Sequence, residues 1–308
     1  MRNIIVPRIL KCLSYLSLPA ARAFGVFVGT CMWFVKGRAY RITLKNTRIC
    51  FPHLSPQETQ IFVRESLVET AKTAAEASII WRNSWEWLES KIVEVEGADL
   101  LRAELAKGQG LIVLAPHLGN WEVTAPYVAS IAPLTAMYQP LEIPAMDKLI
   151  LEGRSKCNIN MAPTNRKGVC MLLKALQQGN MVGILPDQLP KKDAGAEFAS
   201  FFGQETLTMS LVHSLISRTQ ARAVVIFAER VAGGFKVVIL PADEAIYSED
   251  VLISVRGLNA SVEKCVNLAP RQYQWEYNRF RFPKSHAAVR EQKRQAFSCK
   301  ESHCDSNP

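Results

Sequence analysis

The sequence predicts an α/β protein, a mixed sheet with flanking helices, that carries a membrane-associated helix at its N-terminus. Two short apolar runs, 111–115 (LIVLA) and 181–185 (MVGIL), end at proline and are typical of buried strands. Amphipathic helical segments alternate with such runs, which favours one α/β sandwich domain. Near the N-terminus an apolar stretch precedes a cluster of cations, and this pair of features indicates the membrane helix.

The composition is that of a globular protein with a surplus of positive charge. Of the 308 residues, 48% are hydrophobic and 21% are charged, which excludes wholesale disorder and collagen-like repeats. The net charge of +9 implies an anionic partner: nucleic acid, an anionic membrane surface, or an acidic substrate or carrier protein. The eight cysteines are scattered and form no C-x-x-C pair, as expected of reduced thiols in a cytosol-facing protein.

The N-terminal apolar stretch runs from Cys12 to Val35, and we expect Pro19 and Arg22 to interrupt it. The part after Arg22 is shorter than the ~20 residues that span a hydrocarbon core. A cleaved signal peptide or a buried core helix are alternatives. Five cations within residues 36–48 are typical of a cytoplasmic surface that faces anionic lipid. We therefore favour a membrane anchor that lies in the interface or crosses once, at the inner membrane with the rest of the chain cytoplasmic.

Elements after this anchor follow in a regular order. Ser55, with Glu58 three residues on, is typical of a capping box, and predicts a helix from Pro56 to about Trp81. The other expected elements are a helix at 97–107, a strand at 111–115, a helix at 168–178, a strand at 181–185, a helix at 207–218, a strand at 223–227, a turn at 233–234 leading into a strand at 235–240, and a helix at 251–268. We expect three regions: an anchor with its basic segment (1–50), one domain (51–284) and a polar, disordered tail (285–308).

Several familiar motifs are absent from the sequence. It holds no G-x-x-x-x-G-K-[ST], G-x-G-x-x-G, H-E-x-x-H or G-x-S-x-G segment, so the usual signatures of nucleotide binding, zinc peptidases and serine hydrolases are missing. Cys299, His303 and Cys304 could suggest a metal site, but three such residues in a polar tail are more often incidental. We expect neither a metal nor a cofactor.

A histidine and a glutamate follow the strand at 111–115. His117 lies in the loop after the strand, and Glu122 stands five residues on, in the first turns of the next helix. The ends of strands in α/β sheets are where active sites tend to form. If Gly119 allows a sharp turn, Glu122 could bond one ring nitrogen and leave the other as a general base for a hydroxyl. Taken alone, such a pair is more often a structural hydrogen bond.

The segment 111–122, LIVLAPHLGNWE, resembles the H-x4-[DE] block of glycerolipid-type acyltransferases, and its HLGNWE form is similar to that of the late lauroyl and myristoyl transferases of lipid A biosynthesis. Six further segments resemble blocks of the same family, in the same order along the chain: RICFPHLS (48–55), YQP with PAMDKLI (138–150), NRKG with LLKAL (165–176), PDQ (186–188), FFG (201–203) and QWEYNRFR (274–281). Gln139, Ile143 and Ser200 depart from the family pattern, and they leave the choice of acyl chain or acceptor open.

The resemblance implies roles for five residues. His117 is expected to be the general base and Glu122 the carboxylate that orients it. Arg166 is expected to bind an anionic group, a lipid phosphate or the phosphopantetheine of an acyl carrier protein, because a guanidinium suits phosphate; an ordinary surface arginine is the alternative. Asp187 is expected in or beside the site. Asn120 either shapes the loop or binds substrate.

The function that the resemblance implies is transfer of a fatty acyl chain from acyl carrier protein to a hydroxyl of a lipid A precursor, in a glycerolipid-acyltransferase-like fold. The expected partners are this donor, this acceptor and an anionic membrane, with no nucleic acid. One alternative is acylation of another lipid, a phospholipid or an aminolipid. The other alternative is a non-catalytic, basic membrane-binding protein.

Overall fold

A computed structural model describes residues 2–140, 144–155, 157, 159–190 and 195–281. Its α-helices are α1 (Arg2–Leu13), α2 (Leu18–Val35), α3 (Arg38–Cys50), α4 (Pro56–Arg82), α5 (Trp85–Glu89), α6 (Ala98–Ala106), α7 (Trp121–Ala129), α8 (Pro144–Ser155), α9 (Arg166–Gln177), α10 (Leu211–Thr219) and α11 (Val251–Leu268). Two short 3-10 helices are η1 (Glu244–Tyr247) and η2 (Pro270–Gln272). The strands are β1 (Ile92–Glu96), β2 (Leu111–Leu114), β3 (Leu134–Tyr138), β4 (Ile159–Pro163), β5 (Met181–Ile184), β6 (Ala196–Phe201), β7 (Gln204–Met209), β8 (Arg222–Val231) and β9 (Gly234–Pro241). The expected tail (285–308) and its Cys299, His303 and Cys304 lie outside the described residues.

Seven strands form one mixed sheet in the order β1-β9-β8-β2-β5-β3-β4. The β8–β9 hairpin is antiparallel, and every other neighbouring pair is parallel. Strands β6 and β7 form a separate antiparallel hairpin. The predicted α/β class and mixed sheet are therefore confirmed.

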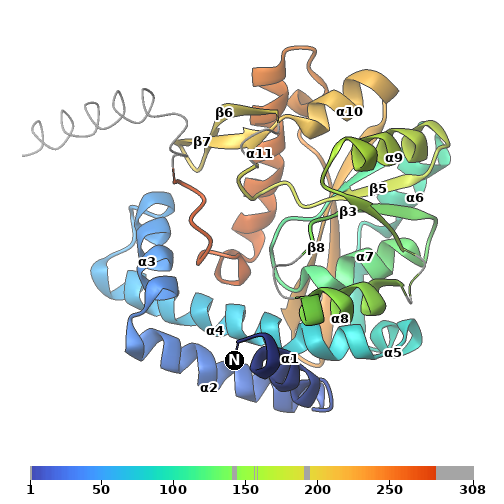
Figure 1. The fold of residues 1–308 in the computed structure, drawn as a ribbon. Coiled ribbons are helices and arrows are strands. Elements are labelled where there is room, and N and C mark those ends of the chain that lie inside the picture. The colour runs from blue at the N-terminus through green and yellow to red at the C-terminus, as the bar shows by residue number, and fades with distance from the viewer. Residues whose placement is uncertain (1, 141–143, 156, 158, 191–194, 282–308) are drawn as a thin grey trace, which may run out of the picture.

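Helices cover both faces of the central sheet (Figure 1). Ile112 and Leu114 point into a core formed with α9, α10 and α11. Leu111 and Val113 point into the opposite core, formed with α5, α6 and α7. Because the strands are buried on both sides, they consist of continuous apolar runs, which explains why β2 and β5 could be located from the sequence.

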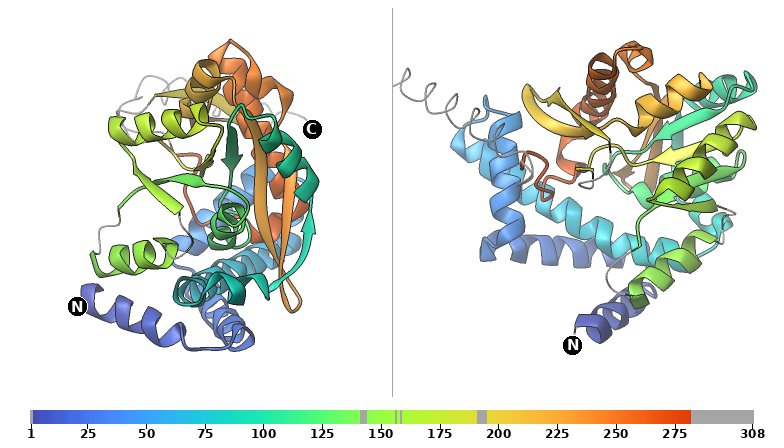
Figure 2. Two further views of the ribbon diagram at one scale, coloured as in Figure 1. Left: turned by 90° about the vertical axis from the view of Figure 1, so that its right-hand side faces the viewer. Right: turned by 45° about the horizontal axis from the view of Figure 1, so that its top comes forward.

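Helices α1, α2 and α4 lie below the sheet in Figure 1, and α3 stands to the left of it; both views of Figure 2 keep α2 alongside α4. The backbones of α2 and α4 are so close that a Cβ atom added at Gly29 would lie 2.4 Å from the Val68 Cα. Pro19 and Arg22 interrupt the apolar composition of this segment but do not break its helix. Pro19 lies in the first turn of α2, where no backbone N–H is needed, and Arg22 continues the helix while bonded to Glu76 of α4.

The other predicted elements are confirmed where the sequence pattern is strongest. The helices at 56–82 and 251–268, the capping box and the β8–β9 turn are confirmed. The predicted helix 207–218 begins too early, because residues 207–209 pair with β6 and the helix starts only at Leu211. The predicted strand 223–227 extends over 222–231, because it pairs with β9 along most of that length.

Candidate active site

His117 and Asp187 meet because they follow two neighbouring parallel strands at the same distance. In the register of β2 and β5, Leu114 pairs with Ile184. His117 and Asp187 each stand three positions after that pair (117 − 114 = 187 − 184 = 3). The carboxyl ends of parallel strands meet at one edge of the sheet, so the fold brings this histidine and this aspartate together.

The imidazole of His117 is held at both nitrogens. Its Nδ1 lies 2.7 Å from the Asp187 Oδ1, and its backbone N–H donates to the Asp187 Oδ2 at 2.8 Å. Because a carboxylate can only accept, Nδ1 carries the proton and Nε2 is the acceptor. The Gln188 Nε2 lies 3.1 Å from the His117 Nε2 and donates to the Gln274 Oε1 at 3.0 Å. The Nε2 lone pair of His117 thus faces this amide.

Asp187 is buried and remains ionised. Burial alone would raise the pKa of its carboxyl, but the charge and the two hydrogen bonds of His117 outweigh burial and hold that pKa below its usual value. Burial, together with the nearby Asp187 carboxylate, raises the pKa of the neighbouring Tyr273 well above its usual value. Asp187 is therefore a buried anion beside a neutral tyrosine.

Glu122 belongs to a different cluster. Its Oε2 accepts from the Trp81 Nε1 at 2.7 Å, and the Arg154 Nη2 donates to its Oε1 at 2.7 Å. Within the part of the chain that the structure describes, no hydrogen bond joins Glu122 to His117. The prediction that Glu122 orients the imidazole is wrong in this geometry. The chain does turn at Gly119 (φ +62°), as expected, but α7 then directs Glu122 toward α4 and α8. Asp187, not Glu122, contacts the Nδ1 of His117.

Glu122 is also an anion. Burial would raise the pKa of its carboxyl, but the ion pair with Arg154 and the hydrogen bond from Trp81 lower it below its usual value. The guanidinium of Arg154 in turn lies over the Tyr138 ring, 5.5 Å from its centroid. Glu122 of α7 therefore fixes the position of Arg154 of α8.

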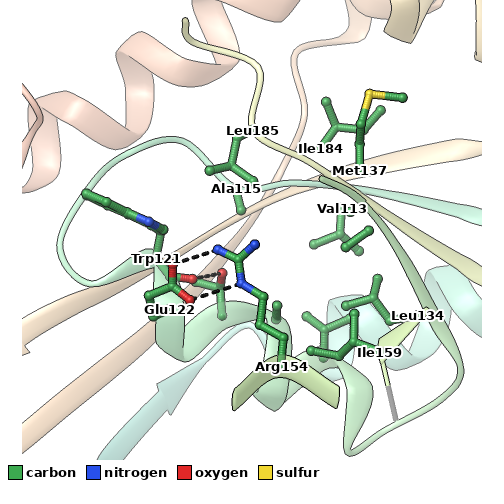
Figure 3. A pocket seen from close by; sticks show the side chains of 15 residues that line it. Val113, Ala115, Trp121, Glu122, Leu134, Met137, Arg154, Ile159, Ile184 and Leu185 are labelled. Carbon is green, nitrogen blue, oxygen red and sulfur yellow. Dashed lines mark hydrogen bonds and ion pairs between the residues drawn. The ribbon is translucent and has the colours of Figure 1, made fainter. Parts of the chain in front are cut away.

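A pocket opens beside this pair (Figure 3). Trp121, Glu122 and Arg154 form its polar end, and apolar side chains of β2, β3, β4 and β5 line the rest, among them Val113, Met137, Ile159 and Ile184. The Trp121 ring also contacts the His117 ring edge-on, with 4.9 Å between centroids. The pocket therefore has a charged end next to the histidine loop and an apolar interior.

The remaining predicted site residues lie apart from His117. Asn120 is fully buried and is the N-cap of α7, because its Oδ1 accepts from the Glu122 N–H. Arg166 is the first residue of α9 and is exposed, and no described contact brings it to the histidine. Among the described residues, no group of three or more His, Cys, Asp or Glu side chains could hold a metal ion.

Sequence reasoning missed three contributors to these clusters. No role in the site was assigned from the sequence to Arg154, Trp81 or Gln274. Each comes from an element far along the chain from the histidine loop. The equal spacing of His117 and Asp187 after their strands was the available signal for their contact, since both strands could be predicted from the sequence.

Comparison with known proteins identifies the family of this chain. Residues 3–282 match the family described as bacterial lipid A biosynthesis acyltransferase. The chain is 27% identical over 257 residues to the lipid A biosynthesis lauroyltransferase of Escherichia coli (strain K12), covering 80% of each chain. It is 27% identical over 254 residues to the palmitoleoyltransferase of the same organism, again covering 80% of each chain. A lipid A biosynthesis acyltransferase of Haemophilus influenzae is 26% identical over 292 residues, covering 91% of this chain and 89% of that one. The chain therefore belongs to the bacterial lipid A biosynthesis acyltransferases and is an acyltransferase.

Proposed function

We propose that this enzyme transfers a fatty acyl chain from acyl carrier protein to a hydroxyl of a lipid A precursor, with His117 as general base. The observation that carries the proposal is the 2.7 Å contact between the His117 Nδ1 and the Asp187 carboxylate. Asp187 holds the proton on Nδ1, so the Nε2 lone pair is available to a hydroxyl that displaces the Gln188 amide.

The reaction needs one proton to move twice. Nε2 takes the proton of the acceptor hydroxyl as its oxygen attacks the thioester carbonyl carbon. The C–S bond then breaks, and the imidazolium returns the proton to the leaving thiolate. Asp187 stabilises the imidazolium between the two transfers. The N-terminus of α7, directly after the histidine loop, provides the positive end of a helix dipole for the oxyanion.

The pocket of Figure 3 suits the acyl chain of the donor. Its apolar interior matches methylene groups, and Arg154, fixed by Glu122, places a cation at the end where the thioester carbonyl would lie. In this proposal Glu122 acts in the site through Arg154. Arg166 and the net charge of +9 suit the phosphates of the acceptor and an acidic carrier protein.

A membrane surface fits the outer side of the N-terminal helices. Among the described helices, only α2 is long and apolar enough to cross a membrane, and only 22% of it is buried. Phe27 and Phe34 of α2 are 66% and 70% exposed. Because the guanidinium of Arg22 is bonded to α4 and to β-sheet carbonyls, we infer that α2 lies in the membrane interface and does not cross it.

The basic helix α3 extends this surface. Arg38, Arg41, Lys45 and Arg48 are all exposed, so they are available to anionic headgroups. We place the protein at the cytoplasmic face of the inner membrane, where acyl carrier protein is available. Flotation with phosphatidylglycerol vesicles tests the surface: the Phe27→Ser/Phe34→Ser variant should bind less than the parent. The variant Leu252→Ser, which changes an exposed leucine of α11, should bind like the parent, and equal binding of all three would contradict the surface.

The decisive assay mixes the purified enzyme with acyl-acyl carrier protein and a lipid A precursor, and detects products by mass spectrometry. We expect an acylated precursor with the parent and none above background with His117→Ala. A parallel reaction with phospholipid acceptors tests the alternative substrate. Acylation of phospholipid alone would contradict the proposal that a lipid A precursor is the acceptor. Equal activity of the His117→Ala variant would contradict the proposed role of His117 as general base.

A further inference from the structure

A second group of buried charges lies outside the site described above, between the N-terminal helices and the sheet. Its centre is Glu76 of α4, whose side chain is 0% exposed. Three donors reach its carboxylate: the Arg22 Nε at 2.6 Å, the Arg230 Nε at 2.8 and 2.9 Å, and the Asn120 Nδ2 at 3.0 Å. These donors come from α2, from β8 and from the loop that follows His117.

Each carboxylate of this group faces two cations: Glu76 faces Arg22 and Arg230, and Glu69 faces Arg230 and Lys72. Arg230 also pairs with Glu69 and donates to the Thr73 Oγ1 at 2.6 Å. The other nitrogens of Arg22 donate to the carbonyls of Val231 and Gly234, each at 2.7 Å. We call this set the Glu76 cluster; its members are Arg22, Glu69, Thr73, Glu76, Asn120 and Arg230. A buried ion-pair network of this kind costs desolvation, so it contributes little net stability compared with apolar packing.

The cluster holds the loop between His117 and Glu122 at two points. Asn120 donates to Glu76 while its Oδ1 caps α7 through the Glu122 N–H. The Thr73 hydroxyl, which receives a bond from Arg230, lies 3.1 Å from the Gly119 carbonyl. Neither link touches the imidazole, yet both fix the peptide groups that connect the two catalytic clusters.

We propose that Glu76 is a positioning residue for acyl transfer, which joins the membrane-facing helix α2 to the loop that carries His117. The expected loss of kcat rests on the proposed function, whereas the expected loosening of the loop does not. When Arg22 is seated, its Nε and the Asn120 Nδ2 both donate to the Glu76 carboxylate. When Arg22 is lost, the carboxylate loses a donor that fixes its position, so its contact with Asn120 is less well fixed and the loop loosens. The enzyme is therefore most active when α2 is packed against α4.

The test compares Glu76→Gln with a matched control, Glu65→Gln. Both carboxylates lie on α4 and pair with an arginine, but Glu65 is exposed and pairs with Arg271. For Glu76→Gln we expect kcat to fall about tenfold or more, with both KM values within about twofold of the parent, because misplaced groups slow chemistry more than binding. Amide hydrogen exchange of residues 118–122 should accelerate by about tenfold or more, since local opening becomes easier. Glu65→Gln should leave both unchanged.

Two milder variants keep the test valid if Glu76→Gln does not fold. Asn120→Ser retains a good helix N-cap but loses the bond to Glu76, and Arg22→Met removes the link to α2. Both should accelerate exchange in the loop and lower kcat, and Arg22→Lys should restore part of each. Parent-like exchange and kcat in both Asn120→Ser and Arg22→Met would overturn the proposal. Exchange needs no substrate, so a parent without activity would count against the proposed function alone.

Discussion

Two buried carboxylates stand close to the same loop and differ in what they hold. Asp187 accepts two hydrogen bonds from His117, whereas Glu122 accepts from Trp81 and pairs with Arg154. Burial opposes ionisation of both, and in each case a cationic or hydrogen-bonding partner outweighs it and keeps the pKa low. The partner therefore decides the role that we propose for each carboxylate. Asp187 orients the imidazole of the proposed base, and Glu122 fixes a guanidinium at the edge of the proposed binding pocket.

Removing the base should have the largest effect. His117→Ala should lower kcat by roughly 10²–10⁴, because no other group accepts the proton of the hydroxyl. Steady-state kinetics with the purified variant measures this, and circular dichroism melting should show that the fold is retained. A variant as active as the parent would remove His117 from the mechanism.

Breaking the Glu122–Arg154 pair should be mainly a matter of stability. Arg154→Met leaves a buried carboxylate without its cation and should cost roughly 3–5 kcal/mol of unfolding free energy. The double variant Glu122→Gln/Arg154→Met should recover most of that loss, because no uncompensated charge then remains. Urea titration of the parent and the two variants checks this. Equal losses in the single and double variants would show that the charge is not the cause.

The Asp187→Asn substitution should lower kcat about 10²-fold or more, since the amide no longer fixes the proton on Nδ1. Glu122→Gln should change kcat less than Asp187→Asn does. The same kinetic assay applies to both variants. A larger loss of kcat in Glu122→Gln would reverse the roles assigned to the two carboxylates.

Arg166 lies outside both clusters and gives a smaller prediction. If its guanidinium binds a phosphate of acceptor or donor with two hydrogen bonds, Arg166→Lys should cost about 1–3 kcal/mol in kcat/KM for that substrate. Varying acceptor and acyl carrier protein separately identifies which one is bound. A lysine variant that matches the parent against both substrates would exclude Arg166 from substrate binding.

Acid should remove the stability that both carboxylates provide. Their pKa values are lower in the folded protein than in the unfolded chain, so their contribution is present above the usual values of 4.5 for Glu122 and 3.8 for Asp187. It is lost as the pH falls through the lowered folded values. The urea midpoint should therefore decline below pH 4.5, and less steeply in Glu122→Gln and Asp187→Asn. Identical acid slopes in parent and variants would contradict this.

The fold was predictable where single segments carry the signal. Apolar runs located β2 and β5, and the capping box located the start of α4. The hairpin β6–β7 was missed because its segments, AEFASF and QETLTM, hold no continuous apolar run, and pairing between the strands decides their structure. Helix α8 was missed as well, so Arg154 could not be placed.

The candidate site was predictable in its residues but not in its pairings. His117, Glu122 and Asp187 were all expected in or near the site. Which carboxylate meets the imidazole depends on the register of β2 and β5 and on the direction of α7, and neither is encoded within the H-x4-E segment. The Glu76 cluster depends on contacts between residues up to 161 positions apart (230 − 69 = 161), which no local pattern reveals.

Nuclear magnetic resonance of the His117 imidazole tests the central claim, that Asp187 and not Glu122 holds the Nδ1 proton. The resonance is assigned by its loss in His117→Ala. The account predicts a downfield Nδ1–H signal in the parent and in Glu122→Gln, and its loss in Asp187→Asn. A signal that persists in Asp187→Asn and disappears in Glu122→Gln would contradict it.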